Sequence, residues 1–202
     1  MKNAKRVIVI LLVNIILVLS VFSTAQAAYL WKWFNTNGSY NHYKYLSNNL
    51  GSSYGGPIDG AFNAWNNVKD SSGNNIFPLS RSSSGTNGSI EFLYNSGATW
   101  LGKVNVTQYE TGSTTYIKKV VIYLNDYHNL SISALPGYYS IPSILTHEVG
   151  HVLGLMHCHE VGGGKCSSST CTSNVLQPSL NAGVTRTTLQ TFDKNAKTKL
   201  YP

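Results

Sequence analysis

The chain has 202 residues, of which 11% are charged, and its formal net charge at neutral pH is +7. The basic residues are scattered along the chain, so the composition gives no indication of a nucleic-acid-binding surface. Without Lys2, Lys5 and Arg6, which lie in an expected leader, the net charge falls to +4. The remaining length is ordinary for one domain with a sizeable core.

Residues 1–27 have the pattern of a secretory signal peptide. A basic start at residues 1–6 precedes an apolar run at residues 7–22, and Ala25-Gln26-Ala27 provides a cleavage site. We therefore expect cleavage after Ala27, secretion, and a single domain over residues 28–202. The alternative is an uncleaved membrane anchor, but the apolar run is shorter than the roughly 20 residues that span a bilayer. No stable membrane association is expected after cleavage.

The first half of the expected domain combines strands with one helix. Residues 29–34 are aromatic and predict a first strand, and a polar loop is expected from there to Pro57. Apolar residues then recur at helical spacing and predict an amphipathic helix that ends before Ser71-Ser72-Gly73. These apolar residues are Ile58, Ala61, Phe62, Trp65 and Val68.

Three more strands are expected after a linker at residues 81–88 that is rich in Ser, Gly and Asn. They are residues 90–94, 100–109 and 116–124, separated by turns at Gly97 and at Thr111-Gly112-Ser113. Residues 125–139 are expected to be a loop.

A second helix is predicted to begin at Ser140, which suits the N-cap position, with Pro142 in the first turn. Gly150 lies inside this helix, where glycine costs about 1 kcal/mol relative to alanine. Its presence there indicates close packing against a neighbouring element. The residues expected to bury the helix are Ile144, Leu145, Val149 and Val152.

The most informative segment, residues 146–157, covers this helix and the chain just after it and reads T-H-E-V-G-H-V-L-G-L-M-H. His147 and His151 are four residues apart, so both imidazoles lie on one helix face. Gly154 permits a turn that brings back His157 as a third nitrogen ligand. Three nitrogen ligands leave one position of a tetrahedral zinc ion open, which is typical of catalytic zinc sites and not of structural ones.

The same segment contains a residue suited to proton transfer. Zinc held by three histidines lowers the pKa of its water molecule to roughly 7. Glu148 is not a ligand but follows the first one, so it can accept the proton as this water attacks a peptide carbonyl and pass it to the leaving amine. His159 is an alternative third ligand, but the spacing from Gly154 favours His157.

The pattern H-E-x-x-H-x-x-G-x-x-H at residues 147–157 is the zinc signature of the metzincin metallopeptidases. The residues that fill it here most resemble those of the matrixin branch. The segment A-F-N-A-W and the ending L-Y-P are also similar to that branch. The resemblance implies an α+β fold with a twisted mixed sheet, a first helix and an active-site helix in residues 28–157. It also implies a small C-terminal subdomain, residues 158–202, that ends in a helix. An edge strand near the cleft pairs with the substrate backbone in this family.

The chain departs from the family at the methionine turn, which forms an apolar floor beneath the zinc. Residues 174–178 resemble this turn, but Leu176 stands where the methionine would be, a change of side chain that usually costs below about 1.5 kcal/mol. We expect Leu176 and Pro178 to lie at the substrate pocket. Matrixins also carry structural zinc and calcium, but the eight carboxylates here form no calcium loop, so calcium is not supported.

The remaining features concern the C-terminal part. A bridge from Cys158 to Cys166 or Cys171 would brace the loop that carries His157, whereas Cys166 with Cys171 would close a small Ser-rich loop, and the sequence does not decide between them. A helix is predicted over residues 187–201, with a capping box formed by Thr187 and Gln190.

Together these features predict a secreted, monomeric zinc endopeptidase that acts on extracellular proteins or peptides. The alternative is a catalytically inactive zinc-binding module on the same fold. Glu148 favours the enzyme, because binding alone needs no general base beside a ligand. Many matrixins are kept latent by a propeptide cysteine, but no cysteine precedes Cys158. We therefore expect activity on secretion, and a stable inactive precursor larger than residues 28–202 would contradict this.

Overall fold

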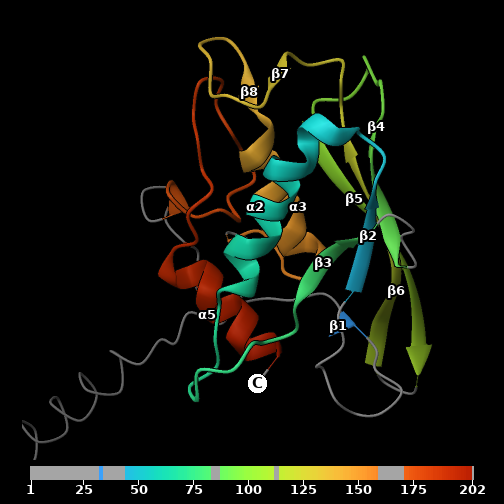
Figure 1. Cartoon of the computed structure of the whole chain (residues 1–202), viewed down its shortest axis with the longest axis vertical. Coiled ribbons are helices and arrows are strands. Elements are labelled where there is room, and N and C mark those ends of the chain that lie inside the picture. The colour runs from blue at the N-terminus through green and yellow to red at the C-terminus, as the bar shows by residue number, and fades with distance from the viewer. Residues whose placement is uncertain (1–31, 34–43, 83–86, 112–113, 159–170, 202) are drawn as a thin grey trace, which may run out of the picture.

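A mixed β-sheet forms one layer of the molecule, and helices pack against one of its faces (Figure 1). The computed structural model describes residues 32–33, 44–82, 87–111, 114–158 and 171–201. The sheet has six strands in the order β1-β6-β4-β2-β3, with β5 on the other side of β6, and β5 is the antiparallel one. The strands are β1 Lys32–Trp33, β2 Lys44–Asn48, β3 Leu79–Ser82, β4 Gly88–Phe92, β5 Gly102–Thr111 and β6 Thr114–Leu124.

The predicted α+β class is confirmed, and so are the three strands expected in the middle of the chain, which correspond to β4, β5 and β6. In β6, the side chains of Val120, Ile122 and Leu124 are buried, while the intervening Val121 and Tyr123 are partly exposed. This alternation is what a strand with one covered face requires.

The loop expected between residue 34 and Pro57 is wrong, because β2 lies within it. β2 pairs in parallel with both β3 and β4, and Leu46 is buried in the core. Its stability comes from backbone pairing on both edges, which a polar sequence does not reveal. The linker expected at residues 81–88 is also wrong at both ends, since β3 extends to Ser82 and β4 begins at Gly88.

The loop expected at residues 125–139 contains a small second sheet. It is formed by β7 Leu130–Ser131 and β8 Tyr139–Ser140. Of the aromatic stretch at residues 29–34, the described residues are those of β1. The expected signal peptide lies outside the described residues, so its cleavage and secretion stay predictions.

Three α-helices complete the described fold: α2 Gly55–Asn66, α3 Ile141–Val152 and α5 Thr191–Leu200, with a short 3-10 turn, η1 Ser52–Tyr54, before α2. The predicted N-cap of α3 is confirmed, because the Ser140 hydroxyl accepts from the backbone N–H of Ser143 at 3.4 Å. The predicted start of the last helix is wrong. Its capping box is formed by Gln190 and Asp193, one turn later than expected. No helix in these described ranges is long and apolar enough to cross a membrane.

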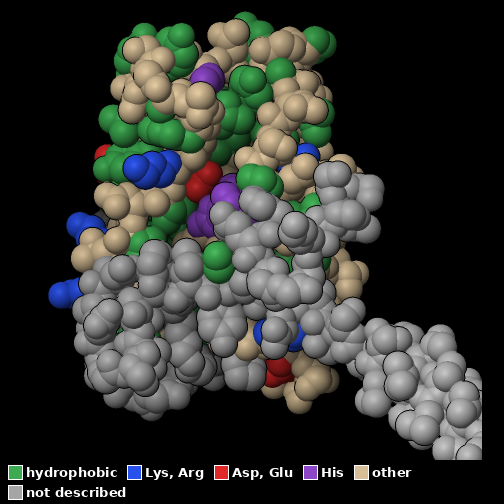
Figure 2. Space-filling view, turned by 180° about the vertical axis from the view of Figure 1, so that it is seen from behind, with side chains coloured by type: hydrophobic (Ala, Val, Ile, Leu, Met, Phe, Trp, Pro, Cys, Tyr) green, Lys and Arg blue, Asp and Glu red, His purple; other side chains and the backbone are tan. Residues whose placement is uncertain are grey.

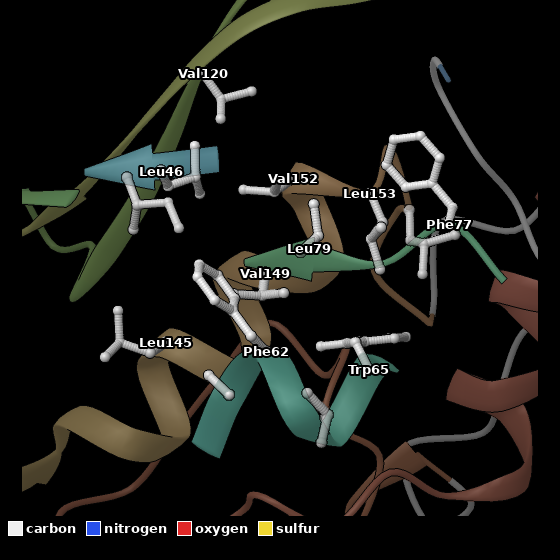
Figure 3. Packing of buried hydrophobic residues seen from close by; sticks show 14 of the residues in the cluster. Leu46, Phe62, Trp65, Phe77, Leu79, Val120, Leu145, Val149, Val152 and Leu153 are labelled. Carbon is white, nitrogen blue, oxygen red and sulfur yellow. The ribbon is translucent and has the colours of Figure 1, made fainter. Parts of the chain in front are cut away.

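Buried hydrogen bonds of two tryptophans hold α3 against the core, and Figure 3 shows one of them, Trp65 of α2, among buried side chains that include Val149 and Val152 of α3. The indole N–H of Trp65 in α2 donates to the carbonyl of Thr146 at 2.8 Å, and the carbonyl of Trp65 accepts from the Lys197 ammonium of α5 at 2.7 Å. The indole N–H of Trp33 donates to the carbonyl of Val152 at 2.9 Å. Because each of these groups is buried and satisfied, the contacts hold α3 in one position against the core.

Gly150 allows α3 to pack closely against the core, as the sequence predicted. A Cβ atom there would lie 2.5 Å from Cδ2 of Leu176 and 2.8 Å from Cζ2 of Trp65, both buried. Overpacking of this kind costs roughly 1–3 kcal/mol. The higher helix propensity of alanine relative to glycine offsets up to about 1 kcal/mol of this cost.

We therefore expect Gly150→Ala to lower the free energy of unfolding by about 1–2 kcal/mol. The matched control is Gly60→Ala in α2, where an added Cβ meets no atom within 4 Å, so that this substitution should be neutral or stabilising. Urea unfolding of both variants beside the wild type measures the difference. Equal stabilities for the two variants would contradict the packing described here.

Candidate metal centre

Three imidazoles converge at the end of α3. The Nε2 atom of His151 lies 2.9 Å from Nε2 of His147 and 3.1 Å from Nε2 of His157, and the remaining pair is 3.3 Å apart. Nitrogen ligands at 2.0–2.1 Å from a tetrahedral zinc ion lie about 3.3 Å from one another. Among the described residues, these three form the group of ligand atoms that could hold a metal ion.

In His147 and His151, the hydrogen-bond partner of Nδ1 shows which ring nitrogen carries the proton. Nδ1 of His147 lies 2.8 Å from the carbonyl of Val175, and Nδ1 of His151 lies 2.7 Å from the carbonyl of Leu155. A carbonyl only accepts, so Nδ1 is the protonated nitrogen in both neutral rings and each Nε2 presents its lone pair to the other. Two facing lone pairs repel unless a cation lies between them.

A proton shared between the imidazoles is a less favourable cation here than a metal ion, because His147 binds protons weakly. The pKa of His147 is lowered well below its usual value, first by burial and next by the positive charge of His151. Neutral imidazole is the form that binds metal. The geometry of the three donors and the lowered pKa of His147 therefore both fit a metal ion.

The turn after α3 places the third histidine. Gly154 has a φ of 86°, a left-handed conformation that residues with a Cβ adopt only under strain. The backbone N–H of Gly154 donates to the carbonyl of His151 at 2.8 Å, which closes the helix end. The predicted turn at Gly154 is confirmed, and it brings both His157 and the carbonyl of Leu155 back to the helix face.

Glu148 lies beside the histidines and is buried. Its carboxylate occupies space that Gly102 of β5 leaves free, since a Cβ on Gly102 would lie 2.6 Å from Oε1 of Glu148. Burial raises the pKa of Glu148 to about 8. A value near neutrality suits a group that must both accept and release a proton.

A cavity of about 610 Å³ opens onto the three histidines and Glu148. One of its walls is the first half of β5, including Gly102, Val104 and Val106. Among the described strands, β5 pairs only with β6. Its other edge, on the side of the cavity, therefore has no partner among these strands. Figure 2 shows histidine side chains next to an acidic side chain in a recess near the centre of this face, with hydrophobic side chains above them.

The two residues expected at the substrate pocket lie at different depths. Pro178 lines the cavity, whereas Leu176 is fully buried against Gly150 and does not line it. The backbone beside them contacts the metal centre, because the carbonyl of Val175 holds His147 and the carbonyl of Leu176 accepts from the N–H of Cys158 at 3.0 Å.

Some sequence predictions fall outside what the structure describes. His159 and Cys166 are not among the described residues, and Cys158 and Cys171 are both buried, so the disulfide pairing stays open. His128 has no motif around it in the sequence, yet it lines the cavity and contacts the rings of Tyr127 and Tyr139.

Asp193 in α5 is a site residue that carries no sequence signal. Its buried carboxylate accepts from the backbone N–H groups of Val175 at 3.0 Å, Leu176 at 3.1 Å and Gln190 at 2.9 Å. It therefore holds the segment whose Val175 carbonyl orients His147. The capping box of α5 and the metal centre share this one carboxylate.

We expect Asp193→Asn to weaken metal binding by up to about 10-fold, the low end of the effect of removing a direct partner of a ligand, because Asp193 acts through the backbone of Val175. An amide cannot accept from all three N–H groups, so the free energy of unfolding should also fall by about 1–3 kcal/mol. Zinc affinity is measured by competition with a chromogenic chelator, with Asp126→Asn at an exposed position as the control. Unchanged affinity in Asp193→Asn would show that the segment is held by other contacts.

The fold and the site together define an α+β protein with a three-histidine centre that could hold a metal ion. No protein-family model matches the chain, and a search of curated proteins likewise found no match.

Proposed function

We propose that this protein is a zinc-dependent endopeptidase of the metzincin class, most similar to the matrixins. The observation that carries the proposal is the convergence of three imidazole nitrogens beside a buried glutamate in one open cavity. The mixed sheet, the first helix α2, the histidine-bearing helix α3 and the terminal helix α5 support it, since the resemblance implies each of them.

The donor set favours zinc over other cations. Three imidazole nitrogens suit zinc and other transition metals, whereas calcium and magnesium prefer oxygen ligands. Three protein ligands also leave one coordination position for a reactant. When bound, zinc supplies Lewis-acid chemistry that acidifies a water molecule and polarises a carbonyl group.

The residues of the chain divide the remaining work. The carbonyls of Val175 and Leu155 keep His147 and His151 in the tautomer that presents Nε2. Glu148 accepts the proton of the attacking water and returns it to the nitrogen of the departing amine. Its buried position strengthens this role, because little bulk water competes for the proton.

The edge of β5 that no described strand pairs with supports an extended peptide as the substrate. A peptide laid along this edge would gain main-chain hydrogen bonds without a strict demand on its sequence. We propose extracellular proteins or peptides as substrates, a monomeric and secreted enzyme, and no nucleic-acid partner. The secretion proposal rests on residues 1–27.

Casein, an unstructured protein, tests the proposal. The purified zinc-loaded protein should convert it to fragments with new amino termini, and a zinc chelator should stop the reaction. A protein that holds one zinc ion per chain and leaves casein and other unfolded proteins intact would contradict the peptidase proposal. The inactive zinc-binding module would then replace it.

A further inference from the structure

The cavity beside the metal centre contains a cation that the zinc motif does not explain. Arg186 lines the cavity together with His147 and Glu148, although it lies far from them in the sequence. It belongs to the segment between Pro178 and α5.

Arg186 is anchored on both sides. Its backbone N–H donates to the hydroxyl of Ser143, in the first turn of α3, at 2.7 Å. Its guanidinium Nη1 donates to the carbonyl of Ser179 at 2.8 Å. These contacts hold the side chain at the cavity wall between α3 and the segment that follows Pro178.

Among the described residues, no carboxylate forms an ion pair with the guanidinium. It has five N–H donors, and within the described ranges one of them is used, in the hydrogen bond to the carbonyl of Ser179. The ion pair found in the described ranges joins Arg81 and Asp59, on another surface. The negative charge of Asp193 raises the pKa of Arg186 through space, but this carboxylate already accepts hydrogen bonds from three backbone N–H groups.

The side chain of Arg186 is partly buried. Burial lowers the pKa of Arg186, because the guanidinium has lost part of its hydration. Lys103 from β5 adds a second positive charge to the lining, while the acidic residue there, Glu148, belongs to the metal centre. Much of the remaining lining is aliphatic, including Leu101, Val104, Ile144, Leu155 and Leu180.

We propose that Arg186 is a specificity-determining residue that makes the cavity select a substrate side chain ending in a carboxylate. The inference rests on the proposed peptidase function. A glutamate side chain fits best, because its two methylene groups pack against the aliphatic lining and its carboxylate accepts two N–H groups of the guanidinium. Aspartate offers the same carboxylate on a shorter stem, and leucine leaves the guanidinium unpaired.

The test is the cleavage of a mixed peptide library by the purified zinc-loaded protein, with mass spectrometry of the new termini. Glutamate, and to a lesser degree aspartate, should be enriched at one position next to the cleaved bond. R186Q should reduce this preference about tenfold or more, as expected for a hydrogen bond to a charged group. R186E should replace it with a preference for lysine and arginine, and R186K should keep part of it.

The matched control is Lys194→Gln on the exposed surface of α5. It removes the same charge as R186Q but lies outside the cavity lining, so the acidic preference should persist. Thermal unfolding of each variant shows whether it is folded. Arg186→Gln leaves the backbone contact with Ser143 intact, which favours folding.

A binding measurement separates this inference from the peptidase proposal. The zinc-loaded Glu148→Gln protein is immobilised, and the peptides that it retains are compared with and without Arg186→Gln. Acidic peptides retained through Arg186, with no cleavage by the wild type, would uphold the role of Arg186 and contradict the peptidase proposal. Cleavage or retention without an acidic preference, or a preference that survives R186Q, overturns the inference.

Discussion

Glu148→Gln should reduce the kcat for casein or peptide hydrolysis by about 100- to 10,000-fold, the usual contribution of a general acid–base group. Glutamine has nearly the same size and shape, so it should fill the space beside Gly102 as glutamate does. Its amide cannot accept the proton of the attacking water. Because Glu148 is not a metal ligand, the zinc content should stay at one ion per chain.

The matched control is Glu91→Gln in β4, a carboxylate that does not line the cavity. It should leave both kcat and the zinc content unchanged. The measurement is a steady-state assay together with elemental analysis of the same samples. Near wild-type turnover in Glu148→Gln would remove this residue from the mechanism, and a loss of zinc would assign it a structural role.

His151→Ala should abolish both metal binding and activity. His151 is the histidine whose Nε2 lies closest to those of the other two, and its removal would leave two nitrogens that cannot enclose an ion. Zinc affinity should fall by more than the roughly 100-fold that loss of an outer hydrogen-bond partner causes. Zinc should also stop raising the unfolding temperature, since a ligand stabilises only the state that binds it.

His128→Ala is the control for metal binding, because His128 lines the same cavity but is not one of the three converging histidines. Zinc affinity from chelator competition and unfolding temperatures with and without zinc are compared for the two variants. Tight zinc binding by His151→Ala would mean that other residues form the metal centre.

The parts of the site that the sequence predicted are local ones. Helical spacing places His147 and His151 on one face, and the conformational freedom of Gly154 explains the turn to His157. The Ser140 cap is a contact between residues three apart. Each of these features depends on the geometry of one short segment, so a single sequence reveals it.

The parts that the sequence did not predict depend on contacts between distant segments. Asp193 acts through the backbone of Val175 and Leu176, and Arg186 reaches the cavity because its backbone is tied to Ser143. Backbone amides have no sequence signature, so such contacts leave no pattern. The strand β2 is not predicted by the sequence for the same reason, since its partners β3 and β4 follow it by more than thirty residues in the chain.

The most direct measurement for the peptidase account is the initial rate of casein hydrolysis against the amount of bound zinc, across samples of the purified protein stripped of metal and reloaded in steps. The account predicts no hydrolysis in the metal-free protein and a rate that rises in proportion to zinc until one ion is bound per chain. Hydrolysis by the metal-free protein, or none at one zinc ion per chain, would contradict it.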